Sequence, residues 1–175
     1  MNIENTIIED VKIITPNIFS DDRGYFFEPY NANSFDDHHK KIVFVQDNES
    51  QSKFGVLRGI HFQKSPYEQS KLVRVIKGKI QDVAVDLRPD SSTFKKYVSV
   101  ILDDVNKKQL FIPKGFGHGF LTLSNETIVS YKVDNFYNQD YDSGVKYDDS
   151  CLNIKWQLNN EDIMLSNKDK QLSYL

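Results

Sequence analysis

The chain has 175 residues, of which 39% are hydrophobic and 13% aromatic, so it can bury a sizeable core and does not have the composition of a disordered chain. Its 22 Lys and Arg residues are outnumbered by 25 Asp and Glu residues, and the net charge of -3 argues against a general nucleic-acid or anionic-membrane binder. The length predicts a single domain over residues 1–175.

The N-terminal third is predicted to contain turns and one short helix. A turn sequence at Asp21 to Gly24 places Arg23 and Glu28 around aromatic residues. Asn and Ser residues in capping positions predict a helix from Asn31 to Lys41.

From Ile42 onward, short apolar segments alternate with period two and are separated by turn residues. Such alternation, with turns every 8 to 12 residues, is typical of a β-sandwich or barrel. The predicted strands are Ile42–Asn48, Gly55–Gln63, Lys71–Val75, Lys79–Leu87, Tyr97–Leu102, Gln109–Ile112, Gly119–Leu123 and Thr127–Val133. Gly78 predicts a tight hairpin turn, and Asn159 to Gln171 predicts a second helix or an ordered tail.

The sequence contains no run of about 18 apolar residues, and its start lacks the basic stretch and apolar run of a secretory signal. We therefore expect a cytoplasmic protein without a membrane span. The single Cys151 cannot form an internal disulfide and lies among polar residues, so we expect no role for it.

Side chains suited to catalysis are densest between Arg58 and Lys71. A hairpin closed by residues 64–70 would place His61 and Lys71 at neighbouring cross-strand positions, with Cβ atoms ~5 Å apart. Strict alternation puts Arg58 and His61 on opposite faces, so both serve one site only if Gly59 marks a β-bulge. The alternative is two solvated charges and a structural histidine, and the predicted register favours the site.

Two later segments add candidate site residues. A glycine-shaped turn between Pro113 and Phe120 delivers His118 onto a strand, where it serves either a site or a hydrogen bond in the core. In Thr127–Val133, alternation places Tyr131 on the same face as two valines. That position suits either a phenol in an interior site or an ordinary core aromatic.

The N-terminal half also contains groups that suit a nucleotide, namely Arg23 with Glu28, and Gln46, Asp47 and Asn48 in a row. A guanidinium can bind a diphosphate with two parallel hydrogen bonds, and amides can read the edge of a base. A surface turn and a surface strand are the alternative. The chain has no glycine-rich phosphate loop of either common pattern.

Taken together, these segments resemble the dTDP-4-dehydrorhamnose 3,5-epimerases, a family of the cupin superfamily. The resemblance spans nearly the whole chain, and the order and spacing of its motifs make it specific. The motifs are Asp22–Glu28, Val45–Asn48, Gly55–Gln63, Gln69–Val75, Asp82–Arg88, Ile112–Phe120, Tyr131–Lys132 with Tyr137, and Leu165–Asp169.

The resemblance implies a mainly β, cupin-type jelly-roll barrel with short peripheral helices, forming a homodimer in which the N-terminal segment reaches the partner's site. It implies that His61 is the general base, which Asp169 orients. Lys71 is the implied cation near the substrate oxygen, and Tyr131 the general acid. The implied substrate contacts are Arg23, Phe26, Glu28, Gln46, Asp47, Asn48, Arg58, His118, Tyr137, Asp142 and Lys168.

The implied reaction converts dTDP-4-dehydro-6-deoxy-D-glucose to dTDP-4-dehydro-L-rhamnose, as in rhamnose biosynthesis. The hydrogens on C3 and C5 both lie α to the C4 ketone, so removal of either leaves charge that delocalises onto the C4 oxygen. A preorganised donor to such charge is typically worth ~3 to 4 kcal/mol, and Lys71 is the candidate. No cofactor and no metal are expected, because the reaction involves no net redox change.

Small departures from the family pattern leave the sugar open. Asp142 lies where the family usually has Glu, and Asn138 and Gln157 lie where Pro is common. An epimerase that inverts only C3 or only C5 of a related 4-keto sugar nucleotide is therefore an alternative.

Two further alternatives come from other classes of protein. Pro113-x-Gly115-x-x-His118 also resembles a metal-binding cupin motif, but His61 and His118 are few histidines for the usual ligand set. A non-catalytic module that binds sugar nucleotides would not need His61, Asp169 and Tyr131 in combination.

Overall fold

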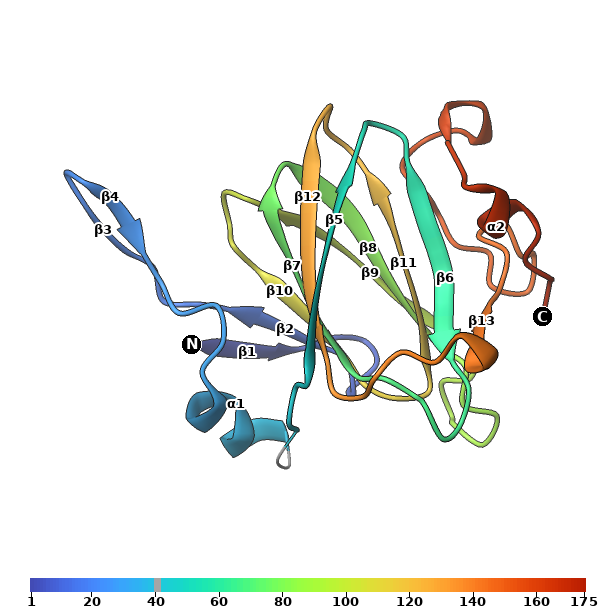
Figure 1. The fold of residues 1–175 in the computed structure, drawn as a ribbon, viewed down its shortest axis with the longest axis horizontal. Helices are drawn as coiled ribbons and strands as arrows, with labels where there is room; N and C mark the ends of the chain where they lie inside the picture. Colours follow the sequence, from blue (N-terminus) through green and yellow to red (C-terminus); the bar gives the residue numbers. More distant parts are fainter. Residues whose placement is uncertain (40–41) are drawn as a thin grey trace.

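The computed structural model describes residues 1–39 and 42–175, and its dominant feature is a pair of facing antiparallel β-sheets (Figure 1). In spatial order, the six-stranded sheet consists of β1 (Asn2–Asn5), β2 (Lys12–Thr15), β10 (Gln109–Ile112), β7 (Lys71–Lys77), β12 (Thr127–Val133) and β5 (Gln46–Ser52). The five-stranded sheet consists of β13 (Asp142–Gly144), β6 (Leu57–Gln63), β11 (Phe116–Thr122), β8 (Lys79–Asp86) and β9 (Tyr97–Asp103). This arrangement is a jelly-roll barrel.

The remaining elements are short. A hairpin of β3 (Phe19–Asp21) and β4 (Gly24–Phe26) precedes helix α1 (Ala32–His39). Toward the C-terminus lie η1 (Gln139–Tyr141), η2 (Asn160–Asp162) and α2 (Asn167–Lys170). No helix in residues 1–39 and 42–175 is long and apolar enough to span a membrane. The cytoplasmic location stays a prediction.

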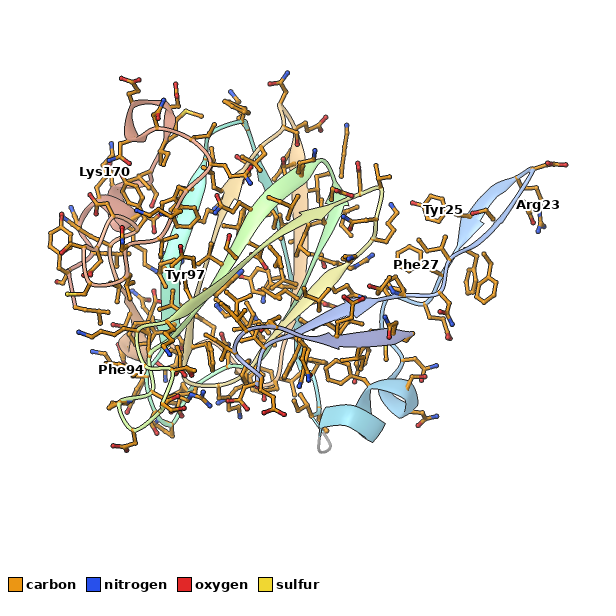
Figure 2. All side chains as sticks on the ribbon, turned by 180° about the vertical axis from the view of Figure 1, so that it is seen from behind. Arg23, Tyr25, Phe27, Phe94, Tyr97 and Lys170 are labelled. Atoms are coloured by element: carbon orange, nitrogen blue, oxygen red, sulfur yellow. The ribbon has the colours of Figure 1, made fainter. Side chains whose placement is uncertain are left out.

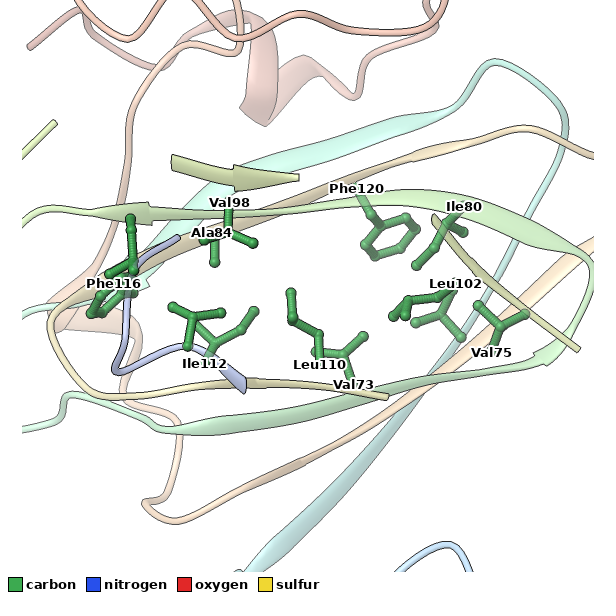
Figure 3. Packing of buried hydrophobic residues seen from close by; sticks show 13 residues of the cluster. Val73, Val75, Ile80, Ala84, Val98, Leu102, Leu110, Ile112, Phe116 and Phe120 are labelled. Atoms are coloured by element: carbon green, nitrogen blue, oxygen red, sulfur yellow. The ribbon is translucent and has the colours of Figure 1, made fainter. Parts of the chain in front are cut away.

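The main core fills the space between the two sheets (Figure 3). Val73 and Leu110 come from the six-stranded sheet, while Ile80 and Leu102 come from the five-stranded sheet, and all four are fully buried. Burying one such side chain contributes about 1.5–3 kcal/mol relative to exposing it. The sheets are therefore held together by the alternate residues that face inward.

The outer faces of the sheets are covered by other parts of the chain. On the five-stranded sheet, Val83 and Val85 of β8 pack against Leu152 and Ile154 of the C-terminal segment. On the six-stranded sheet, Phe35 of α1 packs in a cluster with Ile14, Leu72 and Phe111. Because β8 is covered on both faces, it is buried along almost its whole length.

All eight predicted strands are present, but some of their bounds and connections differ from expectation. The strand predicted over Ile42–Asn48 instead runs over Gln46–Ser52, and β11 begins at Phe116 rather than Gly119. β5 was misplaced because it is polar throughout and forms a sheet edge, paired only to β12. β1 and β13 are likewise mostly polar, and β3 and β4 have three residues each, too few for an alternation to show.

The predicted hairpin at Gly78 is wrong. β7 pairs with β10 and β12, whereas β8 pairs with β9 and β11. The turn at Gly78 therefore carries the chain from one sheet to the other, a connection that local turn chemistry cannot distinguish from a hairpin.

Both predicted helical regions contain helix. The helix expected from Asn31 to Lys41 is observed over Ala32–His39, and its last two expected positions lie outside the described residues. The region from Asn159 to Gln171 contains η2 and α2 joined by an extended stretch.

The β3–β4 hairpin projects away from the barrel (Figures 1 and 2). Its aromatic side chains are largely exposed, Phe19 by 64%, Tyr25 by 59% and Phe26 by 66%, although Lys107 Nζ lies 4.7 Å from the centroid of the Tyr25 ring. An extended arm with three exposed aromatic rings is a typical contact element for another surface.

Candidate active site

A cavity of about 490 Å³ opens between the two sheets. The six-stranded sheet supplies side chains from β5, β7 and β12, and the five-stranded sheet supplies them from β6, β11 and β13. The C-terminal helix α2 completes the wall. The lining residues are Gln46, Asn48, Ser50, Arg58, His61, Phe62, Gln63, Gln69, Lys71, His118, Phe120, Tyr131, Tyr137, Asp142, Ser166, Lys168 and Asp169.

His61 and Asp169 form a hydrogen-bonded pair in this wall, with 2.5 Å between His61 Nε2 and Asp169 Oδ1. The carboxylate can only accept, so Nε2 carries the proton and Nδ1 is left as the basic nitrogen of the neutral ring. Burial alone would raise the pKa of Asp169, but hydrogen bonds from His61 and Ser166 outweigh burial and lower it. The pair therefore contains an ionised carboxylate that orients an imidazole base.

The β-bulge predicted at Gly59 is present. The register between β6 and β11 shifts between His118 and Phe120, opposite this glycine. Gly59 has φ +119°, and a Cβ atom there would lie 2.7 Å from the carbonyl oxygen of His118. The bulge lets both Arg58 and His61 line the cavity, as predicted.

Lys71 lines the cavity, but not through the predicted hairpin with His61. The two residues lie in different sheets, on β7 and β6, and face the cavity from opposite sides. Residues 64–70 pass from one sheet to the other instead of closing a hairpin. Burial of Lys71 lowers the pKa of its ammonium group to about 8, partly offset by Asp82 and Asp142.

His118 combines the two roles that its sequence context left open. It lines the cavity and is hydrogen-bonded in the interior, with 2.7 Å between its Nε2 and Asp82 Oδ1. Burial lowers the pKa of His118, and Asp82 offsets only part of that effect. His118 is therefore a neutral ring whose Nδ1 is a hydrogen-bond acceptor.

Tyr131 lies on the six-stranded sheet, in the wall opposite His61. Its ring packs against the main core and also lines the cavity. The ring centroid lies 6.0 Å from Lys71 Nζ. Burial raises the pKa of Tyr131, so its phenol stays protonated at neutral pH and can donate a proton.

The polar side chains at the start of β5 divide between the two faces of its sheet. Gln46 and Asn48 line the cavity and are joined by a 2.8 Å hydrogen bond. Asp47 lies on the opposite face, where it accepts a hydrogen bond from Lys132 Nζ at 2.7 Å. Asp47 therefore does not line this cavity, because consecutive residues of a strand face opposite ways, and its expected substrate contact stays a prediction.

The rim of the cavity is formed by Tyr137, Asp142 and Lys168. Asp142 Oδ2 accepts a hydrogen bond from the Tyr137 hydroxyl at 3.1 Å and another from Lys168 Nζ. Burial lowers the pKa of Lys168, but the bond to Asp142 outweighs burial and raises it. The rim therefore contains a cation beside a polar aromatic ring.

The three predicted contacts from the N-terminal segment do not line the cavity of their own chain. Arg23 and Phe26 lie on the projecting hairpin, and Glu28 follows it. The Arg23 side chain is 90% exposed and paired with Asp21, with 2.5 Å between Arg23 Nη2 and Asp21 Oδ2. Their expected role is as contacts to a partner's site, and that role stays a prediction.

Sequence reasoning missed several polar groups of the site, among them the lining residues Ser50, Gln63 and Gln69. Asp82 is fully buried behind His118, and its Oδ2 atom has no hydrogen-bond partner among the described residues. A carboxylate in the middle of the buried strand β8 was the available signal. Ser166 contacts Asp169, and the Ser-x-x-Asp spacing of a helix cap was its signal.

Among the side chains that the structure describes, those of residues 1–35 and 42–175, no cluster of three or more His, Cys, Asp and Glu could hold a metal ion.

A jelly-roll barrel in which a histidine–carboxylate pair and a protonated phenol line one cavity from opposite sheets is the arrangement of a class of enzymes suited to acid–base chemistry. Residues 5–175 match the family model described as dTDP-4-dehydrorhamnose 3,5-epimerase. A protein of that name from Methanothermobacter thermautotrophicus is 48% identical over 166 residues, which cover 94% of this chain and 89% of the relative.

Two solved structures of epimerases are similar to this chain in both fold and sequence. The dTDP-4-dehydrorhamnose 3,5-epimerase from Bacillus anthracis str. Ames, with TDP and PPi bound, has a TM-score of 0.96, 47% identity and 99% coverage of both chains. The dTDP-6-deoxy-D-glucose-3,5-epimerase from Legionella pneumophila Philadelphia 1, in complex with dTDP-4-keto-L-rhamnose, has a TM-score of 0.95 and 44% identity, covering 99% of this chain and 92% of that chain. The chain belongs to the dTDP-4-dehydrorhamnose 3,5-epimerase family, and the predicted cupin jelly-roll class is confirmed.

Proposed function

We propose that this protein inverts C3 and C5 of dTDP-4-dehydro-6-deoxy-D-glucose and releases dTDP-4-dehydro-L-rhamnose. The observation that carries the proposal is that the His61–Asp169 pair and Tyr131 line one cavity from opposite sheets. Epimerisation needs a base on one side of a sugar ring and an acid on the other, which this placement offers.

In the first half of each inversion, His61 Nδ1 takes the proton from the carbon next to the ketone. The electron pair of the broken C–H bond moves into the ring, and negative charge develops on the C4 oxygen. Lys71 is the buried cation that stabilises this charge. Asp169 stabilises the imidazolium that forms on His61.

In the second half, the Tyr131 hydroxyl gives its proton to the opposite face of the same carbon. The new C–H bond restores the ketone and leaves a phenolate, and exchange with solvent returns a proton to Tyr131 and removes one from His61. The cycle then repeats at the second carbon. Protons alone are exchanged, and the sugar keeps its oxidation state.

The proposal also covers how the nucleotide part of the substrate is bound and how the chains assemble. Gln46, Asn48 and Arg58 in the wall, with Tyr137 and Lys168 at the rim, suit the polar and anionic parts of a nucleoside diphosphate. We propose a homodimer of single-domain chains in which each hairpin brings Arg23, Phe26 and Glu28 to the partner's cavity. Support comes from the exposed aromatic rings of the hairpin and from its direction away from its own barrel.

Incubation of the proposed substrate with the protein in heavy water tests the reaction. We expect deuterium at both C3 and C5 and the L-rhamno product, followed by NMR. Deuterium at one carbon only would reduce the function to a monoepimerase. Binding without any exchange would leave a non-catalytic sugar-nucleotide module.

A further inference from the structure

We propose that Ser166 is a positioning residue, which fixes the Asp169 carboxylate so that a single oxygen faces His61. The proposal rests on the proposed role of His61 as the base and goes beyond it by adding a third member to the pair. Ser166 Oγ donates to Asp169 Oδ2 at 2.6 Å, while Asp169 Oδ1 contacts His61 Nε2 at 2.5 Å. The two carboxylate oxygens therefore have separate partners.

The Ser166 hydroxyl is fixed by a second contact. Its oxygen accepts a hydrogen bond from the backbone N–H of Asp169 at 3.1 Å, as the N-cap of α2. The hydroxyl proton is thereby directed at the carboxylate, and rotation of the Asp169 side chain would break both bonds to Ser166 and His61. Because Asp169 is only 4% exposed, water is poorly placed to replace the serine.

A hydrogen bond from Ser166 also keeps Asp169 ionised. Burial favours the neutral acid, and Ser166 is one of the groups that oppose burial and lower the pKa of Asp169. An ionised carboxylate stabilises the imidazolium of His61 without taking its proton. Although Ser166 also lines the cavity, its contact with Asp169 gives it a way to act on the chemical step through that carboxylate.

The alternative is that Ser166 only caps α2. That helix also carries Lys168 at the rim of the cavity, so fraying of α2 would displace a predicted substrate contact together with Asp169. A purely structural role therefore predicts a raised KM. A positioning role predicts a lower kcat with an unchanged KM.

The test compares Ser166→Ala, Ser166→Thr and Ser124→Ala with the full-length wild type. We expect Ser166→Ala to lower kcat about tenfold to a hundredfold at unchanged KM, the effect of losing one hydrogen bond to a charged group. Ser166→Thr keeps the hydroxyl and restores most of the rate. Ser124 caps a turn outside the cavity by accepting from Lys79 N at 2.9 Å, and its loss leaves both constants unchanged.

A second measurement does not depend on turnover. The short His61–Asp169 hydrogen bond should give a low-field proton NMR signal, which Ser166→Ala shifts or broadens and Ser166→Thr preserves. A raised KM, an unrescued threonine variant or an unchanged NMR signal in Ser166→Ala would overturn the positioning role. If the wild type itself fails to exchange deuterium, the proposed function fails, and the NMR comparison still decides whether Ser166 positions Asp169.

Discussion

His61 and His118 are directly opposite each other on the antiparallel strands β6 and β11, and each directs its Nε2 atom to a different buried aspartate. The His61 side chain is 29% exposed, and that of His118 is 6% exposed. Two histidines at paired positions therefore differ in how far their rings are buried. Burial lowers the pKa of His118 and keeps its ring neutral as a fixed acceptor, whereas His61 is the more accessible of the two rings.

Separate replacement of His61 and Tyr131 should divide the reaction into its two halves. We expect His61→Asn to abolish deuterium incorporation, because no other group takes the proton. Tyr131→Phe should retain some incorporation but lose inversion, because its phenol returns the proton to the opposite face. Product analysis by NMR in heavy water distinguishes the two, and full turnover by either variant would reassign the roles.

The buried charge of Lys71 should set an upper pH limit for turnover. Its ammonium group is charged below its pKa of about 8 and loses its charge as the pH rises through that value. We therefore expect kcat to fall above pH ~8 with a slope of one proton. The residual rate of Lys71→Met should lack this limb, and a wild-type rate that stays flat to pH 10 would contradict the assignment.

The same burial predicts that Lys71 reduces stability while serving catalysis. The folded chain binds this proton less tightly than the unfolded chain, whose lysine has an ordinary pKa of 10.5, so the charge costs stability at neutral pH. Lys71→Met should raise the free energy of unfolding by up to about 3 kcal/mol at pH 7, while turnover falls to its residual rate. In urea titrations this difference should shrink toward pH 10, and a less stable variant at pH 7 would contradict it.

Mixing of two inactive variants tests where the hairpin acts. Arg23→Ala lacks a hairpin cation, and His61→Asn lacks the base. If each hairpin serves the partner's cavity, random mixed dimers contain one intact site, and about a quarter of the wild-type activity should return. If the hairpin serves its own cavity, mixing gives no more than the average of the two variants.

The glycine at the bulge should tolerate no side chain. Gly59→Ala would place a Cβ atom 2.6 Å from Gly119 Cα and 2.7 Å from the His118 carbonyl oxygen, at a positive φ. We expect a loss of at least about 2 kcal/mol in the free energy of unfolding. Gly24→Ala is the matched control, because it has a similar φ of +130° but no atom within 4 Å, and should cost less.

The sequence allowed prediction of those residues whose place in a local apolar–polar alternation matches the face of the sheet on which they lie. Alternation found the apolar strands and placed Tyr131 on an inward face, and the need for a bulge at Gly59 followed from the positions of Arg58 and His61. Local patterns could not show which strands pair, so His61 and Lys71 were assigned to a hairpin instead of opposite sheets.

Long-range partners required other information. Asp169 lies 108 residues from His61 and no periodicity connects them; the family resemblance supplied that link. The resemblance also included Asp47, which strand alternation places on the outer face of the sheet. Asp82 and Ser166 act through other residues, so neither the alternation nor the predicted contacts identified them.

The projecting hairpin has a consequence for how the protein is assayed. An isolated chain keeps His61, Tyr131 and Lys71 in place but leaves Arg23 far from them. If the proposed homodimer forms, specific activity should therefore fall on dilution, as the subunits separate. Rates measured at nanomolar and micromolar protein would then report on assembly as much as on chemistry.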